Sequence, residues 1–451
     1  MMVELRPLGD VCKTTSGGTP SRSKPHYFKG NIPWIKSGEL PDGIVVENSE
    51  YISDEAISNS SAKLLPAGTL LVALYGATIG KLGILSRPAA TNQAVCAIFP
   101  SDAINTKFLF WYLLAKRPWL IGQAAGGAQP NISQGVVRNL LVPVMPLAAQ
   151  HEIVAEIEKQ FSRLDEAVAN LQRVKANLKR YKASVLKDAV EGRLVPTEAE
   201  LARREGRSFE TGEQLLQRIL DVRKSEWAGR GKYEEPPACE TGGLPNLPNG
   251  WVWASAEQLS TFITKGTTPA AEKLLDGSGD VQFLKVYNLT FDGTLNHTYK
   301  PTFVSRATHE GELLRSQVLA GDVLINIVGP PLGQVSMVPP TMAEANMNQA
   351  VARFRPIKPL STKFVAHALM TESIMAWAIR KAKTTAGQTN LTLDLCRRLP
   401  IPLPPLTEQG RIVAEVDRRL SLVRSVEAEV DTNLKRAQAL RQATLAKAFS
   451  A

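Results

Sequence analysis

Two long stretches of the chain carry apolar residues at the spacing of a coiled coil. In the first stretch the apolar residues recur every seven positions, at Ile157, Leu164, Leu171, Leu178 and Val185. A second apolar position of the same repeat is filled by Val154, Phe161 and Val168, and charged residues occupy most of the others. The pattern predicts one long amphipathic helix, about 55 Å in length at 1.5 Å per residue.

The second stretch repeats this pattern near the end of the sequence. Its apolar positions are Val416, Val423, Val430 and Ala437, joined by Val413, Leu420 and Leu434. Pro146 and Pro405 stand directly ahead of the two stretches, where the first turn of a helix tolerates proline best. We therefore predict helical spacers at residues 147–195 and 406–451, whose apolar stripes require partners.

The segments ahead of the two helices have the residue pattern of folded modules that are rich in strands. Short β-branched or apolar runs bounded by glycine, proline and asparagine predict strands at Thr69–Leu74, Val95–Phe99, Val323–Val328 and Val351–Phe354. The clearest helical patterns are Lys107–Leu114 and Lys363–Ala382. We expect an α+β module at residues 1–146, called module 1, and another at residues 250–405, called module 2.

The two modules are copies of one pattern. The segment GAQPNISQGVVRNLLVPVMPLAAQHEIVAEIE (127–158) aligns without a gap with AGQTNLTLDLCRRLPIPLPPLTEQGRIVAEVD (386–417). Asn131 and Asn390 correspond across this alignment, as do Gln150 and Gln409. An internal repeat of this length indicates that the architecture is doubled.

The repeat continues upstream with small shifts in spacing. SGGTP (16–20) corresponds to KGTTP (265–269), and IPWIKSGEL (32–40) corresponds to VQFLKVYNL (281–289). PAGTLLVALYGATIGKLG (66–83) corresponds to LAGDVLINIVGPPLGQVS (319–336), and TNQAV (91–95) to MNQAV (347–351). Shared framework residues with differing residues between them suit two modules that recognise different targets, and neutral drift after duplication would produce the same pattern.

Residues 196–249 separate the halves and have a polar composition. A helix is possible at Gly212–Trp227, and the stretch PPACETGGLPNLPNG follows it. The proline and glycine content indicates a linker that is at most partly ordered.

The overall charge favours a polyanionic partner. The chain of 451 residues has 53 Lys and Arg against 43 Asp and Glu, a net charge of +10. Module 1 holds 13 basic and 9 acidic residues, so its charge is +4, and module 2 has a similar basic excess.

The remaining composition indicates a cytoplasmic protein. The four cysteines, Cys12, Cys96, Cys239 and Cys396, form no CxxC pair, which argues against a zinc site and a disulfide framework. We see no export signal and no apolar run long enough to cross a membrane.

The order of module, proline-rich segment, long helix, module, proline-rich segment and long helix resembles the specificity subunits of type I restriction-modification systems over nearly the whole chain. The motifs that carry the resemblance are IVAEIE and IVAEVD, QPNIS and QTNLT, the turn GATIGKLG, the strand entry ANMNQAV and the helix end VLKDAVEGRLV. The second helix end, TLAKAFSA, departs from the pattern because it has no counterpart of GRLV (192–195), which puts the terminal contact there in doubt.

The resemblance implies that each module is a target recognition domain for one half of a bipartite DNA site, and that the helices pack antiparallel as a spacer. It also implies partners: double-stranded DNA, two copies of an adenine-N6 methyltransferase subunit, and motor-nuclease restriction subunits. Two similar readers related by a pseudo-two-fold axis would read an asymmetric, split site whose gap is set by helix length. No cofactor is expected.

Candidate DNA-binding residues lie in polar loops of the aligned framework. Asn and Gln can read adenine, and Arg or Lys can read guanine. The candidates are Lys36, Glu39, Thr78, Gln129 and Asn131 in module 1, and Lys285, Asn288, Gln388 and Asn390 in module 2. For each of them a role as a turn or capping residue is an equal alternative. The glycine turns at 76–80 and 329–333 could present backbone N–H groups to phosphate, although a hairpin or bulge is the better interpretation.

The sequence predicts no catalytic residue and no metal ligand. GATIGKL has too few residues between its glycines, and Leu82 where a nucleotide-binding loop needs Ser or Thr. Gly329-Pro330-Pro331-Leu332 lacks both the Asp or Asn and the aromatic residue of an adenine methyltransferase motif, and HEIVA at His151 lacks the second histidine of a zinc motif. A coiled-coil adaptor for proteins and a self-sufficient DNA enzyme with an unrecognised motif are the two alternative functions.

Overall fold

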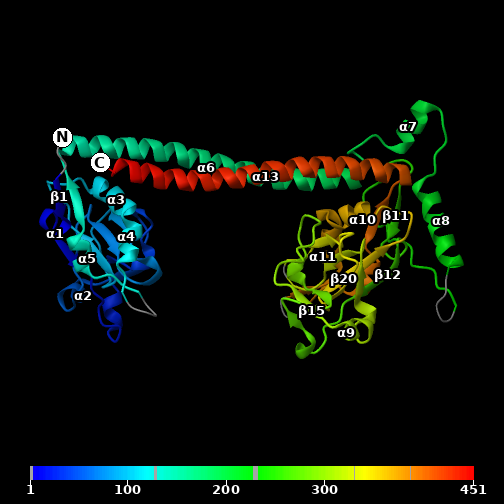
Figure 1. Ribbon diagram of the computed structural model, residues 1–451, viewed down its shortest axis with the longest axis horizontal. Helices are drawn as coiled ribbons and strands as arrows, with labels where there is room; N and C mark the ends of the chain where they lie inside the picture. Colours follow the sequence, from blue (N-terminus) through cyan, green and yellow to red (C-terminus); the bar gives the residue numbers. More distant parts are fainter. Residues whose placement is uncertain (1–3, 126–129, 227–231, 330, 386–387, 451) are drawn as a thin grey trace. The chain divides into compact units, whose positions relative to one another are not determined.

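The computed structural model describes residues 4–125, 130–226, 232–329, 331–385 and 388–450. The chain divides into two compact units, Met1–Arg173 with Glu429–Ala451, and Val174–Ala428. Two long helices, α6 (Leu147–Val190, 44 residues) and α13 (Leu406–Ala448, 43 residues), each contribute to both units (Figure 1). Each unit therefore contains one module and a part of each long helix.

Unit 1 is built around a five-stranded sheet. Its strand order is β2 (Thr14–Ser16), β9 (Val95–Ile98), β6 (Leu70–Ala73), β7 (Leu82–Leu85) and β4 (Gly43–Val45). Smaller sheets are formed by β5 (Glu50–Ile52), β3 (Ile32–Ile35) and β8 (Ala90–Thr91), and by the antiparallel pair β1 (Glu4–Pro7) and β10 (Leu141–Val144). The short helices are α1 (Leu8–Val11), α2 (Asp54–Ser58), α3 (Thr106–Ala115), α4 (Arg117–Gly122) and α5 (Gln134–Asn139).

Unit 2 holds the corresponding sheets. One has the order β12 (Ser260–Lys265), β20 (Val351–Pro356), β17 (Val323–Asn326) and β18 (Val335–Met337). The other has the order β13 (Leu275–Asp276), β15 (Thr302–Val304), β14 (Val281–Leu284), β19 (Glu344–Met347) and β16 (Gln317–Leu319). Two antiparallel pairs complete the module, β11 (Val252–Ser255) with β23 (Pro400–Leu403), and β21 (Lys383–Thr385) with β22 (Gln388–Asn390). Its helices are α9 (Arg306–Glu310), α10 (Thr362–Leu369), α11 (Glu372–Lys381) and α12 (Leu393–Arg397).

The strand orders confirm that the two modules share one scaffold. The order β2-β9-β6-β7 in module 1 corresponds to β12-β20-β17-β18 in module 2. In each module a second sheet contains one parallel pair, β3 with β8 and β14 with β19, flanked by an antiparallel strand. The predicted α+β class, with long helices after the modules, is confirmed.

The glycine turn at 76–80 closes an antiparallel hairpin of β6 and β7. For this segment the sequence favoured a hairpin or bulge over a turn that presents N–H groups to phosphate, and the structure has the hairpin.

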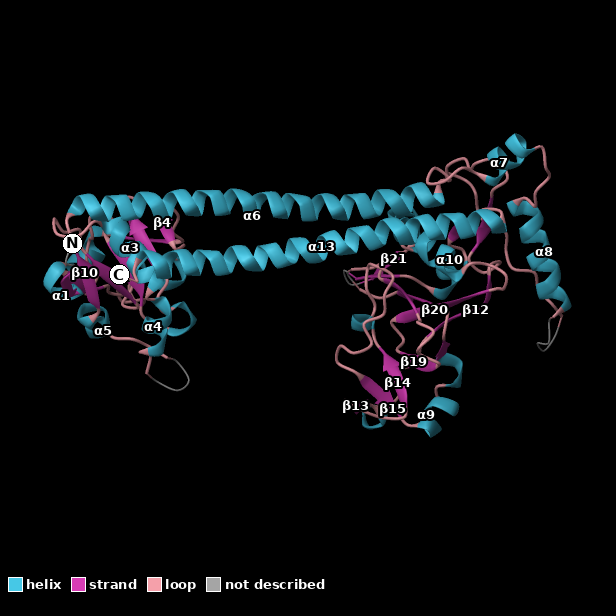
Figure 2. Ribbon diagram, turned by 45° about the horizontal axis from the view of Figure 1, so that its top comes forward, coloured by secondary structure: helices cyan, strands magenta, loops and turns pink. Residues whose placement is uncertain are grey.

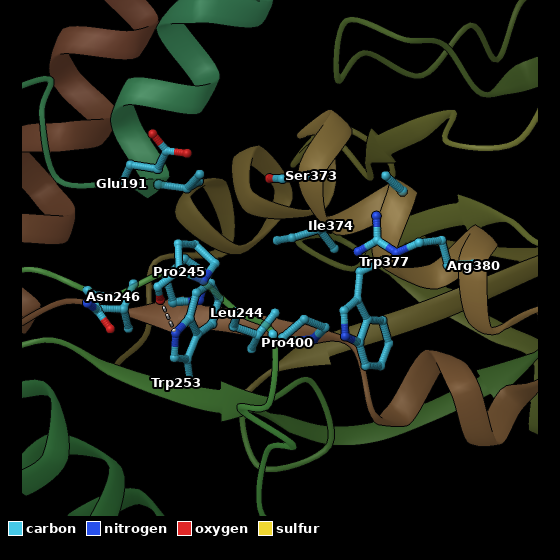
Figure 3. Close-up of a pocket in the computed structure, with 15 residues that line it drawn as sticks. Glu191, Leu244, Pro245, Asn246, Trp253, Ser373, Ile374, Trp377, Arg380 and Pro400 are labelled. Atoms are coloured by element: carbon cyan, nitrogen blue, oxygen red, sulfur yellow. Dashed lines mark hydrogen bonds between the residues drawn. The ribbon is translucent and has the colours of Figure 1, made fainter.

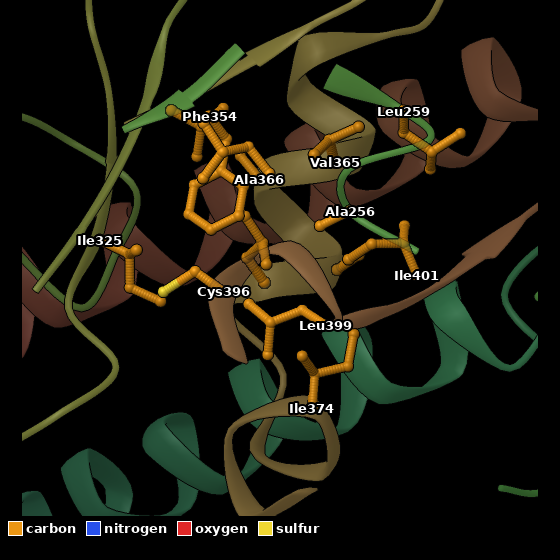
Figure 4. Close-up of a cluster of buried hydrophobic side chains, with 14 of the residues drawn as sticks. Ala256, Leu259, Ile325, Phe354, Val365, Ala366, Ile374, Cys396, Leu399 and Ile401 are labelled. Atoms are coloured by element: carbon orange, nitrogen blue, oxygen red, sulfur yellow. The ribbon is translucent and has the colours of Figure 1, made fainter. Parts of the chain in front are cut away.

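The helix predicted over Lys363–Ala382 is wrong in one respect, because the structure divides it into α10 and α11. Thr371, only 3% exposed, adopts an extended conformation between them, and its hydroxyl donates to the carbonyl oxygen of Ala368 at 2.7 Å. The break lets Ile374 of α11 and Val365 of α10 both face the core of module 2. In Figure 4 these two side chains lie around Cys396, Leu399 and Ile401.

The polar segment between the modules is more ordered than its composition suggested. It forms α7 (Glu198–Glu205) and α8 (Gly212–Ser225), and Leu215 and Ile219 of α8 join the core of module 2. Further along, the indole Nε1 of Trp253 donates to the carbonyl oxygen of Pro245 at 3.1 Å. Figure 3 shows Leu244 and Pro245 beside Trp253 and Trp377, around a small pocket of about 170 Å³. This segment is therefore anchored to module 2.

A buried charge cluster fastens α7 to the start of α13. Glu198 is 2% exposed and forms ion pairs with Arg207 at 2.6 Å and Arg411 at 2.7 Å. Its backbone N–H donates to Oε2 of Glu408 at 2.8 Å, and Nε1 of Trp251 donates to Oε1 of Glu408 at 3.0 Å. Burial raises the pKa of Glu408. Burial also opposes ionisation of Glu198, but the hydrogen bonds from Arg207 and Arg411 outweigh it and hold the pKa of Glu198 below its ordinary value of 4.5.

We expect Glu198→Gln to lower the free energy of unfolding of this unit by about 2 kcal/mol at pH 7, because it leaves Arg411 without its buried partner. A carboxyl group whose pKa is depressed in the folded protein stabilises it above the unfolded pKa, and this contribution is lost as the pH falls through the folded pKa. The difference between wild type and variant should therefore shrink from pH 7 to pH 4 in urea titrations. Glu210→Gln, which removes the exposed pair with Arg218, is the control and should change stability by less than about 1 kcal/mol. A difference that is equal at both pH values would contradict the assignment.

Candidate functional site

The turn that follows β3 in module 1 holds a neighbouring loop through Glu39. Oε2 of Glu39 accepts the backbone N–H of Lys36 at 2.8 Å, and Oε1 accepts the backbone N–H of Ser49 at 3.0 Å. One side chain thus closes its own turn and fastens the loop ahead of β5. The side chain of Glu39 is 20% exposed.

Lys36 belongs to a small ionic network on the same surface. Its Nζ lies 2.9 Å from Oε1 of Glu50, whose Oε2 lies 2.7 Å from the guanidinium of Arg22. The hydrogen bond to Glu50 raises the pKa of Lys36, and the hydrogen bonds from Arg22 and Lys36 lower the pKa of Glu50. Arg22 also lies over the ring of Phe28, 4.2 Å from its centroid. Oε1 of Glu39 also lies 3.8 Å from Nζ of Lys36, so two cations face two carboxylates and these four side chains carry no net charge.

The corresponding turn of module 2 is held by Asn288. Its Oδ1 accepts the backbone N–H of Lys285 at 2.8 Å, and its Nδ2 donates to the carbonyl oxygens of Asn296 at 2.9 Å and Tyr299 at 3.0 Å. Asn288 is only 2% exposed. These bonds favour the turn-holding role that the sequence left open for Glu39 and Asn288 over direct contact with a base.

In module 1 the glycine turn lies beside Asn131, the asparagine that the two repeats share. The backbone N–H of Gly76 donates to the carbonyl oxygen of Pro130 at 2.8 Å, and that of Ile132 donates to Leu74 at 2.9 Å. Thr78 is half-buried and its hydroxyl donates to the carbonyl oxygen of Tyr75 at 2.7 Å. Asn131 is exposed. Gln129 lies outside the described residues.

Module 2 repeats this arrangement with one difference. Asn390 forms a bridge with Val328, and the backbone N–H of Leu391 donates to the carbonyl oxygen of Ile327 at 2.9 Å. Oδ1 of Asn390 is buried and has no hydrogen-bond partner among the described residues. Gln388 belongs to the same strand, β22. The structure thus places the turn of Thr78 beside Asn131 in module 1, and it places Lys36 and Glu39 together at the turn that follows β3.

The two long helices run antiparallel within each unit. In unit 1, Leu445 of α13 packs on Ile157 and Phe161 of α6, and Arg441 pairs with Asp165. In unit 2, Leu186 of α6 packs in one cluster with Val416 and Leu420 of α13, residues that occupy the same repeat positions as Ile157 and Phe161.

The predicted stripe of α6 is buried most fully near the two ends of the helix, whereas the stripe of α13 is buried along its length, with Ala437 also buried. Buried positions are Ile157, Val185, Val416, Val423 and Val430, and half-buried positions are Leu164, Leu171 and Leu178.

Each module is fastened to its helix in the same way. Gln150 of α6 is fully buried; its Oε1 accepts the backbone N–H of Asn105 at 2.7 Å and its Nε2 donates to the carbonyl oxygen of Met145 at 2.7 Å. Gln409 of α13 does the same in unit 2, with the backbone N–H of Ser361 and the carbonyl oxygen of Pro404, each at 3.1 Å.

An ion pair accompanies each glutamine. Lys107 of module 1 lies 2.8 Å from Glu158 of α6, and Lys363 of module 2 lies 2.5 Å from Asp417 of α13.

Among the described residues no cluster of three or more His, Cys, Asp or Glu could hold a metal ion, and no helix is long and apolar enough to span a membrane. Burial raises the pKa of Cys96 to about 12 and likewise that of Cys396, so neither thiol is a ready nucleophile at neutral pH.

Sequence reasoning missed several residues of these surfaces. In module 1 this is Arg22, which contacts Glu50. In module 2 these are Tyr287, Tyr299 and Lys300, which lie on the turn and loop held by Asn288. The available signal was the alternation of basic and aromatic residues in KVYN (285–288) and TYKP (298–301), in segments where the two copies of the repeat differ.

Comparisons with known proteins agree on one family. The model of the type I restriction modification DNA specificity domain matches residues 2–180 and again residues 248–428. The EcoBI specificity subunit of a type I restriction enzyme from Escherichia coli is 27% identical over 94% of this chain and 77% of its own length. The EcoDI specificity subunit from Escherichia coli is 23% identical over 98% of this chain and 86% of its own length.

A solved structure from work on complex assembly and conformational transition of the type I R-M system has the same fold, with a TM-score of 0.67. It is 20% identical and aligns over 99% of this chain and 97% of its own.

Proposed function

Because the chain belongs to the family of type I restriction-modification specificity subunits, we propose that it reads a bipartite, asymmetric DNA site and recruits the methyltransferase and restriction subunits to it. The observation that carries the proposal is the doubled module, fastened to each long helix by an equivalent glutamine and an equivalent ion pair. Two similar readers on one chain suit one site with two different halves.

In this proposal residues 1–146 and 250–405 are the recognition domains. Residues 147–195 and 406–451 form the spacer, and residues 196–249 form the connection. The spacer sets the gap between the half-sites and presents two equivalent surfaces to two copies of an adenine-N6 methyltransferase subunit, which motor-nuclease subunits then join. The complex works in the cytoplasm on double-stranded DNA, and this chain contributes no catalytic group.

Among the candidate DNA-facing residues, Asn131 is exposed, and Lys36 and Lys285 are half-buried. We assign DNA contact to Lys36, Asn131 and Lys285, and assign Glu39 and Asn288 to the loops that they hold. Thr78, Asn390, Gln129 and Gln388 remain candidates as parts of the paired glycine-turn and asparagine segments.

A module exchange tests the proposal. Replacing residues 1–140 with the matching segment of another specificity subunit should change one half-site of the methylated sequence and leave the other half-site and the gap unchanged. Mapping methylated adenines across the genome by single-molecule sequencing reads both halves at once. Loss of both half-sites in an assembled complex would contradict independent modules.

Gel-shift and methylation assays separate this function from its two alternatives. The chain with a co-expressed methyltransferase subunit should shift and methylate duplex DNA specifically, and the chain alone with a methyl donor should methylate nothing. Binding of proteins without any effect on DNA would support a coiled-coil adaptor, and methylation by the chain alone would support an enzyme.

A further inference from the structure

Module 2 carries an exposed cluster of two tyrosines and two lysines, which we call the tyrosine–lysine patch: Lys285, Tyr287, Tyr299 and Lys300. The tyrosine rings meet edge to face, with centroids 5.8 Å apart. Nζ of Lys285 lies 5.8 Å from the ring centroid of Tyr287, and Nζ of Lys300 lies 5.5 Å from that of Tyr299. Tyr287 is 37% exposed and Tyr299 is 48% exposed, Lys300 is exposed and Lys285 is half-buried, so the patch presents both phenol rings and the Lys300 side chain to solvent.

The patch is held rigidly from beneath. Asn288 fastens the carbonyl oxygen of Tyr299 and the backbone N–H of Lys285, and it is itself buried. The hydroxyl of Tyr287 donates to the carbonyl oxygen of Lys300 at 3.2 Å. The backbone N–H of Gly277 donates to the carbonyl oxygen of Pro301 at 2.9 Å. The patch borders strands β13, β15 and β14, which are neighbours in one sheet. Figure 2 shows these strands on the side of module 2 away from α10.

Lys300 has a backbone conformation that lysine rarely adopts. Its φ angle is +45°, in the left-handed region, where the backbone of a non-glycine residue is strained. Glycine would suit this backbone better than lysine does. A strained residue with an exposed cationic side chain suggests that the side chain, not the backbone, is what this position requires.

At the corresponding turn, the described residues of module 1 form no such patch. There Lys36 is engaged by Glu50, and the loop is held by Glu39 in place of Asn288. The two modules therefore present different chemistry on equivalent turns, which is what two different half-sites require. A surface hollow beside the patch is lined by Asp276, Gly277, Tyr287, Lys300 and Pro301, which adds one acidic group to the same surface.

We propose that the tyrosine–lysine patch reads base edges in the half-site recognised by module 2, with Tyr299 and Lys300 as specificity-determining residues and Asn288 as a positioning residue. The proposal rests on the function proposed above. The ammonium group of lysine donates to O6 and N7 of guanine, and a phenol offers both a donor and an acceptor together with an apolar ring for the methyl group of thymine. Rigid placement by Asn288 supplies the geometry that base reading needs.

The test uses the full chain in complex with its methyltransferase subunit and duplex oligonucleotides that carry single changes in either half-site. We expect Lys300→Gly to reduce discrimination at one or more positions of the second half-site by about tenfold or more, while discrimination in the first half-site is unchanged. Tyr299→Phe keeps the ring and removes only the hydroxyl, and it should alter the same half-site. Arg315→Ala removes an equal charge from an exposed position of the same module and should leave both half-sites unchanged.

Stability measurements separate reading from folding, because Lys300→Gly relieves the left-handed strain and should not lower the melting temperature. Asn288→Ala should weaken discrimination in the second half-site and increase hydrogen exchange of residues 296–301. Unchanged discrimination in both Lys300→Gly and Tyr299→Phe would overturn the proposal.

A uniform loss of affinity for all sequences, with a smaller salt dependence, would also overturn it, because it would show contact with phosphate alone. A wild-type complex without any bipartite preference would instead refute the function proposed above.

Discussion

Val416→Asp should abolish stable folding of its unit, with a loss of more than about 4 kcal/mol. Val416 is fully buried in a cluster with Leu186 of α6, Trp251 and Phe364 of module 2. An aspartate there would be an unpaired charge at the point where both helices and the module meet. Circular dichroism during urea unfolding would record the loss, and mass measurement by light scattering would record failure to assemble with the methyltransferase subunit.

Leu171→Asp is the matched comparison, because it puts the same charge on the same stripe at a half-buried position. We expect a loss of about 1 to 2 kcal/mol, since solvent can reach the carboxylate. Equal losses for Val416→Asp and Leu171→Asp would contradict the uneven burial of the stripe.

Under the proposed function, lengthening both helices should lengthen the gap between the half-sites. Four residues inserted after Val168 of α6 and four after Ala437 of α13 would add about 6 Å to the helix pair of unit 1. At about 3.4 Å per base pair, the gap should grow by one or two base pairs, with both half-sites unchanged. An insertion of four residues keeps the apolar stripe aligned by local unwinding, whereas one residue would rotate the stripe away from its partner.

Genome-wide mapping of methylated adenines would show the new gap directly. The insertion in α6 alone is the control, because it disturbs the pairing of Leu445 with Ile157 and Phe161 without a matching extension of α13, and it should reduce assembly. An unchanged gap in an active double-insertion complex would refute the helix pair as the spacer.

The helices and the doubled scaffold could be predicted from the sequence because both depend on local, repeated patterns. The heptad spacing from Ile157 to Val185 and the prolines at 146 and 405 placed α6 and α13 to within a few residues at each end. The break between α10 and α11 could not be predicted from the local pattern. Thr371 lies between the two helices because both of them pack on the core of module 2, which depends on residues distant in sequence.

The candidate site was less predictable, because exposure of a loop residue depends on partners that are distant in sequence. Asn288 and Glu39 have the amide and carboxylate groups of base-reading residues, yet their oxygens bind backbone groups of Lys285, Lys36 and Ser49. Tyr299 and Lys300 lie in a segment that the repeat does not align, and only the hydrogen bonds from Asn288 and Tyr287 bring them beside Lys285.

The glutamine anchors have a consequence for how such proteins change. Gln150 and Gln409 bind only backbone atoms of their modules, the N–H groups of Asn105 and Ser361 and the carbonyl oxygens that precede the helices. A backbone atom is present whatever side chain the residue carries, so the glutamine bonds make no demand on module side chains, unlike the ion pairs of Lys107 and Lys363. Genetic recombination at the segments that encode these prolines and glutamines can therefore replace an entire module in one step, and the glutamine bonds to the helix still form.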